Sequence, residues 1–274
     1  HIDRYRADDT RGLDKETTLP LIEKLGREFE ELANLLSFAG RHALLIVLQG
    51  RDASGKDGTI RKILDYSNVQ SAYVHPFKVP TEVERSHDFL WRVHEAAPAR
   101  GHIAIFNRSH YEDVIAARVH QIVPPSTWKA RYEHINAFER LLADNGTIVL
   151  KFYLHISRQE QIERLLEREQ APQTAWKLNP GDWKELEKWD DVTEAYDDLL
   201  TKCASKALPW YLVPADKKWF RNLAVLERVV EALRPYRKEW VEHLDAIGPE
   251  AKKEIAVIRA RVHVGKTRPK RKRA

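Results

Sequence analysis

LQGRDASGKDGT, residues 48–59, nearly matches the phosphate-binding pattern G-x-x-x-x-G-K-[ST]. Gly50, Gly55 and Lys56 meet the pattern, but Asp57 stands where a Ser or Thr hydroxyl normally coordinates magnesium. The loop follows an apolar run and opens a segment whose apolar residues have helical spacing. A strand, a glycine-rich turn and a helix start in this order predict an anion site, because backbone N–H groups, the helix dipole and the lysine favour negative charge. A glycine-rich turn with a surface lysine is the alternative.

Two carboxylates in this loop need an explanation. Asp57 falls in the first turn of the predicted helix, where an acid is favourable by about 0.3–1 kcal/mol. Asp52 lies inside the loop, and a carboxylate about 4 Å from a phosphate charge is repelled by about 4 kcal/mol at an effective dielectric of about 20. A magnesium ion between Asp52 and the phosphates would remove this repulsion, and a structural pair with Arg51 or a loop cap is the alternative. The residues expected to bind phosphate here are Gly50, Arg51, Ala53, Ser54, Gly55, Lys56 and Asp57.

The segments around the loop predict an α/β fold. Five of them read as buried strands, at 43–49, 72–77, 102–107, 147–156 and 210–215. Helical segments separate most of these strands, and capping boxes at Thr81–Glu84 and Ser157–Glu160 begin two of them. A further helix is expected at 14–39, before the first strand. We therefore expect a five-stranded parallel sheet with helices on both faces and a ligand site at the carboxyl ends of its strands.

Length and charge favour one domain with a basic tail. The chain has 274 residues, 43% of them hydrophobic, which suits a single domain over residues 1–265. Its net charge of +5 is concentrated in residues 266–274, which carry six basic residues and no acid. We expect this tail to be disordered and solvated, with nucleic-acid or other polyanion binding as the alternative.

Two further observations concern the compartment. The longest apolar run, ALLIVL, is far shorter than the roughly 20 residues that a membrane span needs, so no membrane partner is expected. The chain has one cysteine, Cys203, which is compatible with a reducing cytoplasm and with other compartments. We expect a cytoplasmic protein.

The stretch FNRSHYEDV, residues 106–114, ends the third predicted strand at the same sheet edge as the loop. Arg108 can form a planar fork to phosphate oxygens, and Glu112 or Asp113 could hold metal or substrate hydroxyls. The alternative is a capping box from Ser109 to Glu112 with solvated acids. Lys78 follows the second strand at this edge, and Arg118 lies about two turns into the next helix. The residues expected to bind a nucleotide are Lys78, Asn107, Arg108, Glu112 and Asp113, with Asp52 and Asp113 as metal ligands.

Residues 158–188 are interpreted as a mobile lid. Arg164 and Arg168 are four residues apart and share one helix face, and Lys177 follows in a break that contains Pro, Gly and Trp residues. These three side chains are expected to bind a polyanionic donor. The alternative is a plain helical hairpin anchored by Trp residues, with the arginines solvated or paired with Glu.

Four stretches, GRDASGKDG, FNRSHYED, WKLNPGDW and PWYLVPADKKWFRN, resemble the family-2 polyphosphate kinases, and the match runs in order from Tyr5 to Leu233. The resemblance implies a P-loop phosphotransferase related in fold to thymidylate kinase. Such enzymes move phosphoryl groups between inorganic polyphosphate and nucleotides with Mg²⁺, and Mn²⁺ is an alternative ion. By resemblance, the essential loop residues are Asp52 and Lys56, the phosphate-facing arginines are Arg108 and Arg118, and the lid residues are Arg164, Arg168 and Lys177.

Details of these motifs refine the expectation. Asn107-Arg108-Ser109 followed by Tyr111-Glu112-Asp113 resembles the class that phosphorylates both nucleoside mono- and diphosphates. Ala171 and Thr174 stand where the family's lid pattern has Asp and Lys, which predicts altered lid closure or polyphosphate affinity. The resemblance also implies a homo-oligomer, either a dimer or a tetramer.

The expected activity is that of a polyphosphate-dependent nucleotide kinase acting on AMP and ADP, in either direction. An ordinary nucleotide kinase with ATP as donor is the direct rival, and a non-catalytic protein that binds nucleic acid through its basic tail is the rival from another class.

Overall fold

The computed structural model describes residues 1–170 and 178–264, and its centre is a five-stranded parallel sheet with the order β2-β3-β1-β4-β5. The strands are β1 (Ala43–Gln49), β2 (Ala72–Pro76), β3 (Ile103–Asn107), β4 (Thr147–His155) and β5 (Trp210–Pro214). All five predicted strands are confirmed, with bounds that differ by no more than one residue. The loop after β1 lies between the neighbours β3 and β4, where the strand order reverses, and such a switch point is where open parallel sheets bind ligands.

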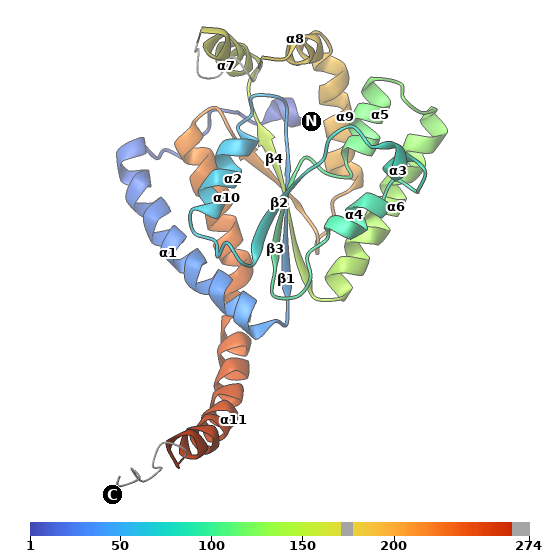
Figure 1. The fold of residues 1–274 in the computed structure, drawn as a ribbon. Coiled ribbons are helices and arrows are strands. Elements are labelled where there is room, and N and C mark those ends of the chain that lie inside the picture. Colours follow the sequence, from blue (N-terminus) through green and yellow to red (C-terminus); the bar gives the residue numbers. More distant parts are fainter. Residues whose placement is uncertain (171–177, 265–274) are drawn as a thin grey trace, which may run out of the picture.

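Helices cover both faces of this sheet (Figure 1). One face carries α1 (Lys15–Ala39), α2 (Lys56–Leu64) and α10 (Lys218–Leu233), and the other carries α4 (Trp91–Ala96), α5 (Glu112–Val119), α6 (Pro125–Asp144) and α9 (Trp189–Lys202). Together with the sheet, this arrangement is a P-loop kinase-like fold, as expected from the sequence.

Alternate residues of β1 build a separate core on each face. Leu44, Ile46 and Leu48 pack in the cluster that includes α1 and α10, whereas Leu45 and Val47 pack in the cluster that includes α5 and α6. Successive strand side chains point to opposite faces, so a strand that is apolar throughout must be covered on both sides. The continuous run ALLIVL therefore places β1 at the centre of the sheet.

The remaining elements lie at the two ends of the molecule (Figure 1). Beyond the carboxyl ends of the strands lie α7 (Arg158–Gln170) and α8 (Pro180–Glu187), while α11 (Arg237–Val264) projects away from the opposite end. Three short helices complete the elements of the described ranges: η1 (Ile2–Arg4), α3 (Glu82–Arg85) and η3 (Arg234–Tyr236). No helix in the described ranges is long and apolar enough to cross a membrane.

The predicted N-terminal helix is confirmed as α1, although it contains a glycine. Asp14 caps it by accepting a hydrogen bond from the Thr17 amide at 2.8 Å. A Cβ at Gly26 would lie 2.2 Å from the ring of Tyr66, so a side chain there would displace the ring that packs against the helix. The close contact with Tyr66 therefore explains why α1 has a glycine at position 26, although glycine in a helix interior is destabilising.

The helical segment expected to begin with the capping box at Thr81–Glu84 forms two helices, α3 and α4. The predicted capping box is present, because the Thr81 side chain and Glu84 bond reciprocally at the start of α3. The helix ends at Arg85, and the Asp88 carboxylate then accepts from the Leu90 amide at 2.9 Å just before α4 begins. An Asp side chain that bonds to the backbone two residues later favours a turn over a continuous helix.

The second predicted capping box forms only in part. The Glu160 amide donates to Ser157 Oγ at 3.2 Å, but the Ser157 amide donates to Asp216 at 2.9 Å and not to Glu160. Glu160 instead pairs with Arg164 at 2.8 Å. Lys177, Ala171, Thr174 and the basic tail 266–274 lie outside the described residues.

Candidate active site

The loop after β1 has the backbone of an anion site, and glycine is needed at its first position. Gly50 has a φ of 150°, and a Cβ there would approach the Leu154 carbonyl oxygen to 2.8 Å. Ala53 also has a left-handed backbone, with a φ of 62°. The α2 helix then begins at Lys56, so its free amides and dipole face the loop.

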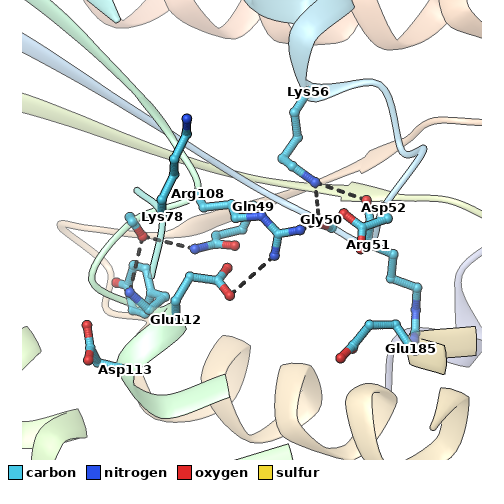
Figure 2. A network of polar contacts seen from close by, with 12 residues as sticks. Gln49, Gly50, Arg51, Asp52, Lys56, Lys78, Arg108, Glu112, Asp113 and Glu185 are labelled. Carbon is cyan, nitrogen blue, oxygen red and sulfur yellow. Dashed lines mark hydrogen bonds and ion pairs between the residues drawn. The ribbon is translucent and has the colours of Figure 1, made fainter. Parts of the chain in front are cut away.

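Lys56 folds back over this loop (Figure 2). Its Nζ donates to the carbonyl oxygens of Gly50 at 2.7 Å and Arg51 at 3.0 Å. Burial and the neighbouring Arg108 cation lower the pKa of Lys56 to about 8. An anion in the loop would favour the charged ammonium and raise that pKa again.

Arg108 lies between two carboxylates (Figure 2). Its guanidinium donates to Asp52 Oδ1 at 2.5 Å and to Glu112 Oε2 at 3.3 Å. The Glu112 carboxylate, together with Asp52, raises the pKa of Arg108 above its ordinary value. Burial acts to raise the pKa of Asp52, but Arg108 and Lys56 offset this, so that the pKa is lowered. The carboxylate inside the phosphate loop is thus ionised, with its charge held by Arg108 and not by Arg51.

The backbone of Arg108 is strained. Its φ of 61° lies in the left-handed region, which non-glycine residues adopt rarely and at a cost of about 1–3 kcal/mol. Its amide donates to the Leu48 carbonyl at 3.1 Å, which ties the turn after β3 to the end of β1. The strained turn points the guanidinium toward the loop after β1.

Gln49, the last residue of β1, fixes Glu112 from the other side. With the amide oriented to satisfy both of its ends, Gln49 donates to Glu112 at 3.0 Å and accepts from the Ser109 amide at 3.2 Å. Ser109 therefore holds Gln49, and the alternative of a capping box between Ser109 and Glu112 is not present. Sequence reasoning missed Gln49, although its place at the end of the central strand is a usable signal.

Three cavities meet around Arg108, which lines all of them. The basic cavity, about 860 Å³, lies over the phosphate loop and is lined by eight basic and three acidic residues. Its basic residues are Lys56, Arg61, Lys78, Arg108, Arg164, Arg168, Lys218 and Arg221. The apolar cavity, about 660 Å³, lies beyond Arg108 and is lined in part by Phe77, Val79, Phe89, Ile122 and Val123. The third, the acidic cavity of about 320 Å³, includes Asp52, Glu112, Asp182 and Glu185.

All five residues expected from the sequence to bind a nucleotide line these cavities. Lys78 lines both the basic and the apolar cavity, and Glu112 lines both the apolar and the acidic cavity. Asn107 borders the basic cavity and donates to Asp57 at 3.0 Å. Asp113 lies in the apolar cavity, where it accepts from Arg92 at 3.1 Å.

Arg51 and Arg118, two other residues expected at the phosphate site, bond instead to α9. Arg51 donates to Thr193 at 2.5 Å and lies over the ring of Trp189, 3.7 Å from its centre. Arg118 pairs with Asp198 at 2.7 Å and is not among the described residues that line the three cavities. Both arginines thus bind α9 to the sheet in this arrangement.

The two arginines of the predicted lid differ from one another. Arg164 is buried, with 6% exposure, and donates to the carbonyl oxygens of Ala53, Ala215 and Asp216 at 2.8 to 2.9 Å. Arg168 is half-buried and pairs with Asp182 of α8 at 3.1 Å. Both border the basic cavity, but the donors of Arg164 already hold the phosphate loop against β5. Lys177 lies outside the described residues.

A second polar network lies behind the site and is buried. Lys151 donates to Glu139 and to the Cys203 carbonyl, each at 2.7 Å, and Glu139 also accepts from His110 at 3.2 Å and from the Tyr111 hydroxyl. Glu139 and Lys151 are each 1% exposed. This network joins the turn after β3 to α6 and β4.

Comparisons with known proteins agree with this geometry. The family model described as polyphosphate kinase 2 matches residues 12–240. The AMP/ADP-polyphosphate phosphotransferase of Meiothermus ruber is 43% identical over 259 residues, covering 94% of this chain and 95% of that relative. The ADP-polyphosphate phosphotransferase of Rhodopseudomonas palustris is 38% identical over 89% of this chain and 88% of its own length. The crystal structure of polyphosphate kinase 2 from Arthrobacter aurescens matches with a TM-score of 0.82, at 35% identity over 84% of each chain.

Proposed function

The chain belongs to the polyphosphate kinase 2 family, and we propose that its site transfers terminal phosphoryl groups from inorganic polyphosphate to AMP and to ADP, and in the reverse direction. One observation carries the proposal: Arg108 borders a basic cavity suited to a polyanion and an apolar cavity suited to a nucleoside. A phosphoryl group that passes between two such ligands must cross the junction where Arg108 lies. The relatives named as polyphosphate phosphotransferases for AMP and ADP support this choice of substrates.

The donor binds in the basic cavity. Five cationic residues border it besides Lys56, Arg108 and Arg164, and amides at the start of α2 add a positive field. Lys56, now bonded to loop carbonyls, moves its ammonium onto a phosphate oxygen when the donor is present. Catalysis of phosphoryl transfer depends mainly on such positioning and charge neutralisation by the protein.

The acceptor binds with its base and ribose in the apolar cavity and its phosphate toward Arg108. The cavity volume, about 660 Å³, falls within the range of small-molecule sites. Phe89 lies there under the guanidinium of Arg131, 4.9 Å from its ring centre, so that an aromatic face and a cation are already in place. Glu112, held by Gln49, is placed to accept hydrogen bonds from hydroxyl or amino groups of the bound nucleotide.

In the transfer itself, an oxygen of the acceptor's terminal phosphate forms a bond to the donor's last phosphorus. The bond from that phosphorus to the bridging oxygen breaks, and its electron pair stays on the shortened donor. Charge spreads over the oxygens of the transferred group, and Lys56 and Arg108, which both line the basic cavity, can neutralise it. The strained Arg108 backbone fixes the direction of the guanidinium before substrate binds, which is the preorganisation that electrostatic catalysis needs.

The loop also fits a divalent cation, and we propose Mg²⁺, with Mn²⁺ as an alternative. Asp52 supplies an ionised, hard oxygen at the border of the basic and acidic cavities. Within residues 1–170 and 178–264, three or more His, Cys, Asp or Glu side chains do not gather in a metal-binding group. One carboxylate combined with phosphate oxygens and water is typical of magnesium at phosphoryl-transfer sites. When bound, the ion neutralises donor charge and orients the transferred group.

Asp113 suits the metal role less well than Asp52. It accepts from Arg92 at 3.1 Å and lies 3.7 Å from an Arg131 nitrogen, inside the apolar cavity. Two cations already neutralise its charge, so we propose that Asp113 holds these arginines beside the nucleoside.

Location and assembly complete the proposal. Cys203 is buried and unpaired, which is compatible with a reducing cytoplasm, and we propose that compartment.

We also propose a homo-oligomer, a dimer or tetramer, in which a second copy covers the half-exposed apolar residues of α11. These are Ile247, Ile255, Val257, Ile258 and Val262. Light scattering tests this assembly, and a monomeric mass would contradict it.

The deciding experiment supplies AMP, long-chain polyphosphate and Mg²⁺ without ATP. We expect ADP first and then ATP, measured by ion-exchange chromatography. A Lys56→Met sample, which lacks the loop cation, controls for contaminating kinases. Product formed only when ATP replaces polyphosphate would instead identify an ordinary nucleotide kinase. Replacing AMP and ADP with GMP and GDP in the same assay measures the base preference.

A further inference from the structure

The start of α10 carries an unusual set of charges. Lys217 is the N-cap residue, and Lys218 and Arg221 follow in the first turn, which contains no acidic residue. The N-cap makes no side-chain hydrogen bond to the free amides. Helix starts normally favour acids, because the amides and the dipole are positive there. Three cations at this position raise the local positive charge further and suit a bound polyanion.

Arg221 adds a positive charge that is buried inside the protein. It is 3% exposed and donates to Asn222 at 3.0 Å and to the Ser54 carbonyl at 3.4 Å, but it makes no ion pair with a carboxylate in the described part of the chain. Burial and the neighbouring Arg164 lower its pKa to about 10. A buried cation without an anionic partner is unfavourable. Arg221 borders the basic cavity beside Gly55, so an anion over the phosphate loop would supply that partner.

A further cavity, about 590 Å³, continues from this point between α1 and α10. Lys218 lines both this distal cavity and the basic cavity, so the start of α10 borders the two of them. Lys15 and Lys217 also line the distal cavity. These three lysines are exposed and form no ion pair within the described residues.

The acidic groups of the distal cavity are already engaged. Glu23 accepts from the Tyr66 hydroxyl at 2.9 Å, and Asp216 accepts from the Ser157 amide at 2.9 Å. Lys62 is the fourth lysine of this cavity, and its charge is already balanced because it pairs with Asp65 at 2.8 Å. The charge left for a ligand is that of Lys15, Lys217 and Lys218, of which Lys218 also lines the basic cavity.

We propose that the polyphosphate chain leaves the basic cavity across the start of α10 and enters the distal cavity, where phosphates remote from the transferred group bind Lys218, Lys217 and Lys15. This inference rests on the proposed function and adds a distal donor subsite to it. A long chain reaches the subsite, whereas tripolyphosphate ends within the basic cavity. The distal lysines therefore favour long donors over short ones.

Donor binding without nucleotide tests the subsite apart from turnover. Titration calorimetry measures Kd for long-chain polyphosphate and for tripolyphosphate with the wild-type chain and with the double variant Lys15→Gln/Lys217→Gln. We expect the double variant to weaken long-chain binding by about 2- to 5-fold for each lysine removed, and to leave tripolyphosphate binding unchanged. The loss should shrink at high salt, because exposed charges are screened.

A matched variant, Lys24→Gln/Lys206→Gln, removes the same charge from two exposed lysines outside the cavities. It should leave both dissociation constants unchanged. Equal weakening of the two donors by the distal variant, or no weakening of the long donor, would overturn the subsite. Equal weakening of long-chain binding by the matched variant would overturn it too, because net charge would then explain the effect. Failure to form ADP in the turnover assay would count against the proposed function, and the binding result would still decide the subsite.

Discussion

Two charged networks meet at the turn after β3, and they differ in what their charges face. Arg108 and Glu112 point to the cavities, where Asp52 completes a network that borders open space. His110 and Tyr111, between them in sequence, point the other way and join Glu139 and Lys151 in a network closed off from solvent. The difference teaches that neighbouring residues of one charged motif can face different surroundings: the open network borders the cavities proposed to bind substrate, and the closed network is buried inside the fold.

The largest effect is expected in the closed network. Glu139→Gln removes the carboxylate that partners Lys151, and breaking a buried pair by removing one member costs about 3–5 kcal/mol. Urea unfolding should show that loss, while kcat per folded molecule stays near the wild-type value. The control Glu139→Leu/Lys151→Met removes both charges and should recover part of the stability. Normal stability of Glu139→Gln together with a strongly reduced kcat would instead mean that the closed network is part of the active site.

Acid should act on the same network. Burial alone would raise the pKa of Glu139, but His110 and Lys151 lower it below its ordinary value. A depressed carboxyl pKa gives stability that is present above the unfolded pKa and is lost as pH falls through the folded pKa. The difference in unfolding free energy between wild type and Glu139→Gln should therefore shrink as the pH is lowered through that range. A constant difference would show that the lost stability is packing and not charge.

The next largest effect is expected in the open network. Asp52→Asn keeps the size of the side chain but removes the charge proposed to hold Mg²⁺ and to pair with Arg108. Losing a positioned electrostatic group costs about 2.7–4 kcal/mol of transition-state stabilisation, or about 10²–10³ in kcat. The checks are kcat across a magnesium titration and the Tm, which should change little. A near-normal kcat with an unchanged dependence on magnesium would contradict the role of Asp52 as a metal ligand.

The open network should also depend on alkaline pH through Lys56. Its pKa of about 8 in the free protein means that the ammonium is lost as pH rises above that value. We expect kcat/KM to fall above pH 8, by about tenfold per unit, because kcat/KM reports the free enzyme. The fall in kcat should come at higher pH, since a bound polyanion raises the pKa. Lys56→Arg, which stays charged, should be less active but show no bend near pH 8; a bend that persists in this variant would assign it to another group.

The sequence predicted the sheet and the open network because both depend on local signals. The apolar runs predicted the strands, and the spacing of the glycines predicted the loop that begins at Gly50. The carboxyl ends of parallel strands meet at one edge, so Arg108 could be placed beside Asp52 without coordinates. The charge on Asp52 was expected to be balanced by magnesium or by Arg51, whereas in the structure Arg108 pairs with it.

What the sequence could not predict depends on contacts between distant segments. Nothing local distinguishes Arg164, which is buried against loop carbonyls, from Arg168, which faces α8. Arg118 lay at plausible helical spacing, yet Asp198 lies 80 residues later and determines its direction. Arg221 was missed for the same reason, because only the packing of α10 against the loop brings it to the basic cavity.

A smaller effect is expected for the acceptor. Glu112→Asn keeps a polar group beside Gln49 but removes the carboxylate that faces the apolar and acidic cavities. If Glu112 positions the nucleoside monophosphate, kcat/KM for AMP should fall about tenfold more than kcat/KM for ADP, the range of a hydrogen bond to a charged group. Parallel assays with the two acceptors and one donor concentration measure that ratio. Equal losses for AMP and ADP would limit Glu112 to holding Arg108.

The smallest effect is expected from Arg168, which belongs to the predicted lid and lies half-buried at the basic cavity. Burial, and after it the nearby Asp52 charge, raise the pKa of its partner Asp182, so this carboxylate is a weakened competitor for the arginine. A polyanionic donor can therefore draw Arg168 from Asp182 into the basic cavity, at the modest gain typical of exposed ion pairs. Arg168→Ala should raise the KM for polyphosphate by about two- to fivefold at low salt and leave the Tm unchanged. Arg158→Ala, on the same helix but outside the cavities, is the control and should leave that KM unchanged. If the two variants behave alike, Arg168 does not bind the donor, and the open network ends at Arg108.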